Sequence, residues 1–188
     1  MKKALLLLAL VLVIALTGCS QQSEASSQEL PASSSSMSSS GQPGKNSDVA
    51  EAYQEVKELL SSKEYKNYSD LADKVTEEDI PNLIKNGNYQ VIEYYSDKAN
   101  RCYKEFPDYK GTNERASEIY SEAKLCATCL ATELGSAELA ALGVAMNDTD
   151  SAHRYMLELK DNMKTTDKAL KLFTDDINRL ADDYAATL

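Results

Sequence analysis

The sequence has no tryptophan, a single histidine and too few basic residues to balance its acidic ones. It contains 30 aspartate and glutamate residues against 20 lysine and arginine residues, for a formal net charge of −10. This balance argues against binding to nucleic acid and against electrostatic docking on anionic lipid. Because His153 is the only histidine, the chain cannot supply the two Glu-x-x-His pairs that hold the metals of ferritin-like di-iron bundles.

Sustained alternation of apolar and polar residues, the mark of a half-buried β-strand, is absent beyond residue 47. Apolar residues recur there at intervals of three and four, which is typical of amphipathic helices. The sequence therefore predicts an all-α domain over residues 47–188, which is long enough for a core of its own.

Charged residues are absent from the 13-residue apolar stretch Ala4–Leu16, which follows Lys2 and Lys3. A positive start, a short apolar segment and a small-residue cleavage site are typical of a secretory signal. The stretch is too short to span a bilayer, which takes about 20 apolar residues. We therefore expect residues 1–18 to be a signal peptide that is removed on export.

The four residues Leu16-Thr17-Gly18-Cys19 resemble the lipobox of bacterial lipoproteins. The resemblance implies cleavage before Cys19, a diacylglyceryl group on its sulfur and acylation of the new amino terminus. It implies an extracytoplasmic protein that is held at the cell membrane by lipid, or at an outer membrane where the host has one. Two or more acyl chains suit stable anchoring, because each buried CH₂ contributes ~0.8 kcal/mol.

Residues 19–46 make up a low-complexity segment behind the expected lipid anchor. Between residues 20 and 48, 12 of 29 residues are serine, and few are apolar. So little apolar surface does not offset the entropy lost on ordering. We expect a disordered tether.

Capping residues and apolar spacing predict where the helices lie. Asp48, with Glu51 three residues later, forms a capping-box pattern that predicts a first helix ending near Tyr65. Ser69 and Asp79 would cap two short pieces, the second of which ends at Gly87. Three longer helices are predicted. The first covers residues 88–106, and the second runs from a cap at Thr112 or Asn113 to about Met146, with a break near Gly135 left open. The third follows the turn at 147–150, and its apolar spacing runs from Ala152 to Tyr184.

The last two predicted helices form an antiparallel hairpin, because only a short Asn/Asp-rich turn, 147–150, separates them. The first carries mainly alanine on its apolar stripe, and the second carries larger residues, with Leu170 at its middle. Small side chains facing large ones let two axes approach closely. We expect an elongated three- to four-helix bundle built on this hairpin.

The candidates for chemistry each have a structural interpretation. Cys126 and Cys129 have the spacing of a disulfide or metal motif, but they fall within one predicted helix and no second such pair exists. Antiparallel register places Cys102 ~13 Å along the axis from Cys126, beyond disulfide reach. We expect free thiols, a surface position for His153, and solvated helix faces for the acidic pairs 175–176 and 182–183. The sequence thus predicts no catalytic, cofactor or metal residue.

Tyrosine is the one enriched residue type, and 9 of its 11 positions lie between residues 53 and 120. Tyr94 and Tyr95 are adjacent on a predicted helix, so we expect one of them to face solvent. An exposed tyrosine ring offers apolar area with a polar tip and suits glycan or protein binding, whereas the alternative is packing within the bundle.

These features favour a non-enzymatic, membrane-anchored module that binds an envelope protein or a cell-wall component, with self-association left open. The alternative is a ligand- or metal-binding lipoprotein that serves a transporter. It requires a concave site, for which the tyrosine-rich half is the candidate region.

Overall fold

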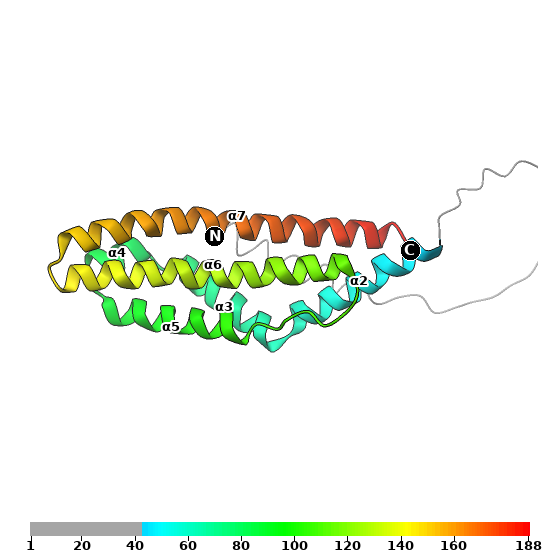
Figure 1. Cartoon of the computed structure of the whole chain (residues 1–188), viewed down its shortest axis with the longest axis horizontal. Helices are drawn as coiled ribbons and strands as arrows, with labels where there is room; N and C mark the ends of the chain where they lie inside the picture. The colour runs from blue at the N-terminus through cyan, green and yellow to red at the C-terminus, as the bar shows by residue number, and fades with distance from the viewer. Residues whose placement is uncertain (1–42) are drawn as a thin grey trace, which may run out of the picture. The chain divides into compact units, whose positions relative to one another are not determined.

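The computed structural model describes residues 43–188, with side chains from residue 46 onward, and residues 46–188 form one compact unit. Every regular element in the described range is an α-helix, so the predicted all-α bundle is confirmed. The helices are α2 (Pro43–Ser61), α3 (Lys63–Glu77), α4 (Ile80–Lys85), α5 (Tyr89–Glu105), α6 (Glu114–Ala145) and α7 (Thr149–Ala185) (Figure 1). The predicted signal peptide, Cys19 and most of the predicted tether lie outside the described residues.

Helices α6 and α7 run antiparallel around a tight turn, as predicted (Figure 1). Asn147 has a φ of 56°, in the left-handed region that ends many helices. The Asp148 N–H donates to the Gly143 carbonyl at 2.8 Å, and the Asn147 N–H donates to Val144 at 3.1 Å. Asp148 then caps α7 by accepting a hydrogen bond from the Ser151 N–H at 3.1 Å. One Asn-Asp dipeptide therefore both ends α6 and starts α7.

Helix α6 is the central helix of the bundle, in contact with α7 and with both α4 and α5. It is long and apolar enough to cross a membrane by length and composition, but more than half of that stretch is buried inside the protein. Its alanines are mostly buried, which lets the neighbouring helices approach closely. Helix α6 therefore has the character of a core helix.

Helix α7 packs mainly on α6, and its buried seam is consequently narrower than its sequence pattern predicts. Phe173, Ile177 and Leu180 are buried, whereas Leu170 is half-buried. The spacing of three and four that predicts a buried apolar stripe on this helix also includes Met163, which is 41% exposed, so the expectation of a fully buried stripe is wrong at that position. A helix that packs mainly on one neighbour buries a narrower apolar face than a helix that packs on two.

The first predicted helix begins and ends at other residues than expected. Helix α2 starts at Pro43, inside the predicted tether, because proline suits the first helical turn, where its missing N–H costs no hydrogen bond. Asp48 is therefore not an N-cap. The break comes at Ser62, whose hydroxyl accepts a hydrogen bond from the Tyr65 N–H at 3.1 Å and caps α3. Ser69 lies within α3, so its predicted capping role was wrong as well.

The predicted starts of α4, α5 and α6 are confirmed. Asp79 caps α4 and accepts from the Asn82 N–H at 3.1 Å, and Gly87 ends that helix with a φ of 68°. Helix α5 begins after Asn88 and ends just before Pro107. Asn113 caps α6 and accepts from the Ala116 N–H at 3.1 Å.

Candidate functional site

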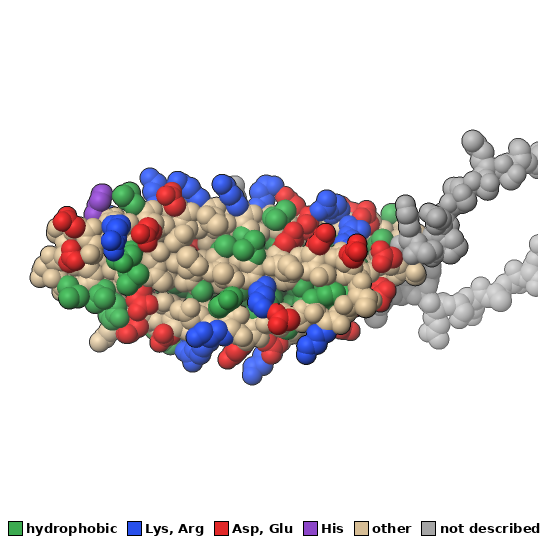
Figure 2. Space-filling model, viewed as in Figure 1, with side chains coloured by type: hydrophobic (Ala, Val, Ile, Leu, Met, Phe, Trp, Pro, Cys, Tyr) green, Lys and Arg blue, Asp and Glu red, His purple; other side chains and the backbone are tan. Residues whose placement is uncertain are grey.

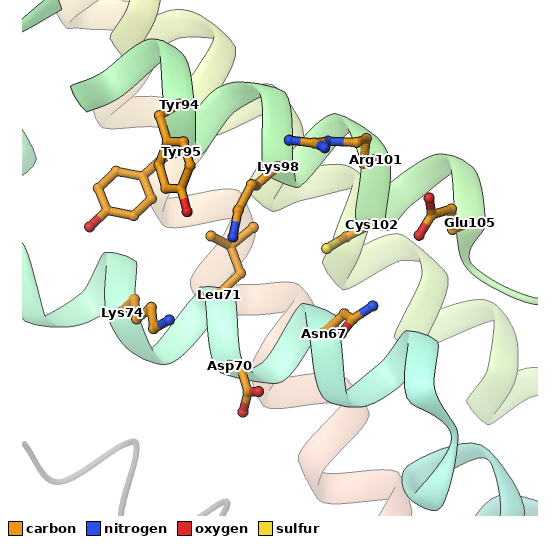
Figure 3. Close-up of a pocket in the computed structure, with 10 residues that line it drawn as sticks. All are labelled: Asn67, Asp70, Leu71, Lys74, Tyr94, Tyr95, Lys98, Arg101, Cys102 and Glu105. Carbon is orange, nitrogen blue, oxygen red and sulfur yellow. The ribbon is translucent and has the colours of Figure 1, made fainter. Parts of the chain in front are cut away.

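A groove between α3 and α5 is one of the concave features that the described residues form; a larger one, of about 460 Å³, is lined mainly by charged residues of α6 and α7. The groove between α3 and α5 has a volume of about 300 Å³. Figure 3 shows side chains from both helices lining it. They are Asn67, Asp70, Leu71 and Lys74 from α3, and Tyr94, Tyr95, Lys98, Arg101, Cys102 and Glu105 from α5. We call this feature the α3–α5 groove.

Both walls of the groove are fixed by local sequence signals. The Ser62 cap sets the start of α3, and Asn88 and Pro107 bracket α5. Leu71 is buried and forms an apolar part of the lining. The polar groove residues stand on two helices that pack on each other, which holds them more firmly than a loop would.

Two tyrosines stand at one end of the groove, with rings in contact at a centroid distance of 5.6 Å and an angle of 62° (Figure 3). Tyr95 is half-buried, and its hydroxyl donates to Glu78 Oε1 at 3.0 Å. Tyr94 is 52% exposed. The expectation that one of this pair faces solvent is confirmed, and Tyr94 is that residue.

Positive charge gathers beside the exposed tyrosine. The Lys98 ammonium lies 4.8 Å from the centre of the Tyr94 ring. A hydrogen bond from Lys98 lowers the pKa of the Tyr94 hydroxyl, and the nearby charges of Lys98, Lys74 and Arg101 lower that pKa further. Three cationic side chains therefore lie on the same groove as the exposed Tyr94 ring.

Cys102 also lines the groove, but as a neutral thiol. Burial raises the pKa of Cys102, and the nearby Glu105 carboxylate raises it further. A thiolate, not a thiol, is the nucleophile and metal ligand. Cys102 therefore contributes a small polarisable surface to the groove and no nucleophile.

The other two described cysteines lie in the core, and all three are free. Tyr68 is buried among aromatic rings, and its hydroxyl hydrogen-bonds the Cys126 sulfur. Burial raises the pKa of Cys126 to about 12. Cys126 and Cys129 thus pack as small buried groups in α6, as predicted.

His153 is exposed near the start of α7, as predicted (Figure 2). Within residues 43–188, no group of three or more histidine, cysteine, aspartate or glutamate residues is arranged to hold a metal ion. Cys19, the predicted lipidation site, lies outside the described residues.

A pair of carboxyl groups links α6 to α7 away from the groove. The pKa of Glu122 is raised to about 7, most of all by burial and then by a hydrogen bond with Asp176 and by the charges of Asp176 and Glu118. Arg179 forms an ion pair with Asp176 and opposes the shift. One Glu122 oxygen is buried without a hydrogen-bond partner. The prediction of a solvated face holds for Asp175, whereas Asp176 turns toward α6 and is largely buried.

The carboxyl pair predicts a pH-dependent stability. The folded state keeps the Glu122 proton to a higher pH than the unfolded chain does, so this group stabilises the fold below its unfolded pKa and loses that contribution as pH rises toward about 7. Glu122→Gln mimics the protonated form. We expect it to raise the free energy of unfolding by about 1 kcal/mol at pH 8, discounted for solvent screening, and to change little at pH 4.5.

Urea denaturation at the two pH values measures this difference. Glu138→Gln is the control, since it removes an acid on the same helix that does not contribute to the Glu122 pKa shift. An equal gain at both pH values would show that general charge reduction, and not the Glu122 proton, causes the change.

Sequence reasoning missed the groove itself. Tyrosine enrichment pointed to the correct half of the chain, and the adjacent Tyr94 and Tyr95 were identified. Lys74 and Lys98 are 24 positions apart in sequence and meet only because α3 packs on α5. The available sequence signal was the presence of Lys74 on one predicted helix and of Lys98 and Arg101 on another.

Comparisons with known proteins do not place the chain in a family. No family model, no curated protein and no solved structure matches it.

Proposed function

We propose that this chain is a lipid-anchored, extracytoplasmic module that binds a component of the cell envelope without catalysing a reaction. The observation that carries the proposal is the sequence Leu16-Thr17-Gly18-Cys19, directly after an apolar stretch with a positive start. A thioether-linked lipid on Cys19 would hold the protein at the bilayer. Residues 19–42 would then connect the anchor to the helical domain.

The α3–α5 groove supports the binding part of the proposal. It combines an exposed aromatic ring, cationic groups and an apolar floor, a set that recognises ligands by contact and charge. Its half-buried thiol has a raised pKa, and Lys98 contacts the Tyr94 ring. These are features of recognition and not of an activated nucleophile.

A small-ligand protein that serves a transporter is the second candidate function. The groove volume of about 300 Å³ favours it, because pockets for small molecules begin near this size. The two candidates share one site and differ in whether the occupant is free or part of a larger structure.

Substitution of the predicted lipidated cysteine tests the anchor. We expect Cys19→Ala to move the protein from the membrane fraction to the soluble fraction or to leave it as an uncleaved, larger form. The reason is that the acyl chains would supply the membrane affinity. Cell fractionation followed by mass spectrometry of the N-terminus measures both outcomes.

Two further measurements make the test specific. Cys102→Ala, at a thiol within the folded domain, should fractionate as the wild type does. Chemical crosslinking in intact cells should capture an envelope component with wild-type protein and lose it with Cys19→Ala. A Cys19→Ala protein that stays membrane-bound at the processed size would contradict the anchor.

A further inference from the structure

We propose that the α3–α5 groove binds a sugar that carries a single acidic group, an inference that rests on the proposed envelope-binding function. The class of ligand follows from three kinds of group that meet in the groove: an aromatic face, cations and hydrogen-bond acceptors. Each selects a different part of the ligand.

The aromatic part is Tyr94. It keeps half of its surface in solvent, although its neighbour Tyr95 is tied down by Glu78. Because Lys98 lies over the Tyr94 ring and Tyr95 meets it edge to face, the ring is held in place before a ligand arrives. A fixed aromatic surface binds the C–H face of a sugar ring with little loss of conformational entropy.

The cationic part comes from both walls. Lys74 stands on α3, and Lys98 and Arg101 stand on α5 (Figure 3). Within residues 46–188, none of the three forms an ion pair with a carboxylate, whereas Arg115, Lys124 and Arg179 each do. The charges of these three residues are therefore not neutralised by a carboxylate and can pair with an acidic group on a ligand in charge-assisted hydrogen bonds, with Lys98 also in contact with Tyr94.

The acceptor part limits how much negative charge the ligand carries. Asp70 and Glu105 line the same groove and would repel a polyanion. As ionised carboxylates they accept hydrogen bonds only, so they pair well with hydroxyl groups. Asn67 adds an amide that both donates and accepts. One acidic group with several hydroxyls around it fits this lining better than a bare anion or a highly charged polymer does.

The size of the groove agrees with such a ligand. A volume of about 300 Å³ lies at the lower end of the range for ligand pockets. This space suits one or two sugar rings. Acidic sugars occur both free and as units of envelope polymers, and the inferred chemistry is the same for both sources.

Titration of the purified full-length chain in detergent, followed by ligand-observed NMR, tests the inference. The acidic probes are glucuronic acid and N-acetylmuramic acid, and the neutral probes are glucose and N-acetylglucosamine. Acetate and inorganic phosphate test charge alone. We expect each acidic sugar to bind at least about tenfold more tightly than its neutral counterpart, the worth of one charge-assisted hydrogen bond. Acetate and phosphate should not displace the bound acidic sugar when they are added at the same concentration as that sugar.

Two groove variants and two matched controls locate the binding. Tyr94→Ala and Lys98→Ala should each weaken binding of the acidic sugar about tenfold or more. Tyr103→Ala and Lys104→Ala make the same chemical changes on α5 outside the groove lining, and they should bind as the wild type does. Because Tyr94 and Lys98 are not core residues, circular dichroism should show all four variants folded.

Several results would overturn the inference. They are equal binding of acidic and neutral sugars, displacement by acetate or phosphate, unchanged binding in the groove variants, or no binding at all. A soluble cell-wall fragment that binds more tightly than the free sugar would identify a polymer as the source, and equal affinity would identify the free sugar. Fractionation of Cys19→Ala is independent of these titrations, so loss of the groove inference and loss of the anchor are distinguishable.

Discussion

Phe173→Ala should destabilise the helical domain by about 3–5 kcal/mol, because it removes a large aromatic side chain from a site that leaves none of it exposed. Phe173 lies on α7, and its ring centre is 6.0 Å from that of Tyr65 on α3. One side chain thus joins the C-terminal hairpin to an N-terminal helix. Its loss should create a cavity that the surrounding helices fill only in part.

Urea denaturation monitored by circular dichroism measures the loss, together with a fall in melting temperature of about 10–20 °C. Leu172→Ala is the matched control, since it truncates a neighbour on the same helix that is 48% exposed. Surface truncations of this kind change stability by about 0.5 kcal/mol or less. If Phe173→Ala and Leu172→Ala unfolded at the same urea concentration, the core would be centred elsewhere.

The apolar stripe of α7 shows how far the sequence pattern reaches. Periodicity places Leu170 and Phe173 on the same face, and it predicted one long unbroken helix, which α7 is. Periodicity does not show which of the two side chains is more deeply buried, because burial depends on the helices packed against each position. Leu170 is half-buried, whereas Phe173 is fully buried with its ring against Tyr65 of α3. The helix was therefore predictable, and its most important core residue was not.

Helix caps were predictable where the capping side chain and its hydrogen-bond partner are close in sequence. Asp79 and Asn113 each accept a hydrogen bond from an N–H three residues later, so the signal is contained in four residues. Asp48 carried a similar signal and was misinterpreted. Its carboxylate and carbonyl oxygens accept hydrogen bonds from the Asn113 side chain at 2.9 Å, across 65 positions. A tertiary contact of this kind leaves no trace in the local sequence.

The attachment of α2 depends on similar long-range contacts. The Tyr53 ring stacks on Tyr184 at 4.1 Å, and the Tyr109 hydroxyl donates to Glu55 at 2.7 Å. The tyrosines of the N-terminal half therefore fall into two groups. Most of these rings join helices together, which was the structural alternative, whereas Tyr94 keeps about half of its surface exposed.

The two glycines of α6 should respond in opposite directions to the same substitution. Alanine is more favourable than glycine inside a helix by about 1 kcal/mol, and this helix propensity alone predicts that both changes stabilise. A Cβ at Gly135 meets nothing within 4 Å. We therefore expect Gly135→Ala to stabilise the domain by about 0.5–1 kcal/mol.

Gly143 lies where α6 and α7 approach most closely beside their turn. A Cβ there would come within 2.7 Å of the Ala152 backbone nitrogen and 3.0 Å of its Cα. Those atoms belong to the first turn of α7 and cannot rotate away, so the helices must separate. Overpacking costs about 1–3 kcal/mol, which exceeds the gain in helix propensity.

We therefore expect Gly143→Ala to lower the free energy of unfolding by about 1–2 kcal/mol, measured by urea denaturation beside Gly135→Ala. Stabilisation by both variants would mean that the hairpin is looser than described. Destabilisation by both would mean that α6 does not tolerate a side chain at Gly135 either. Only opposite signs agree with a hairpin that depends on one small residue at its crossing point, where glycine serves close approach and not flexibility.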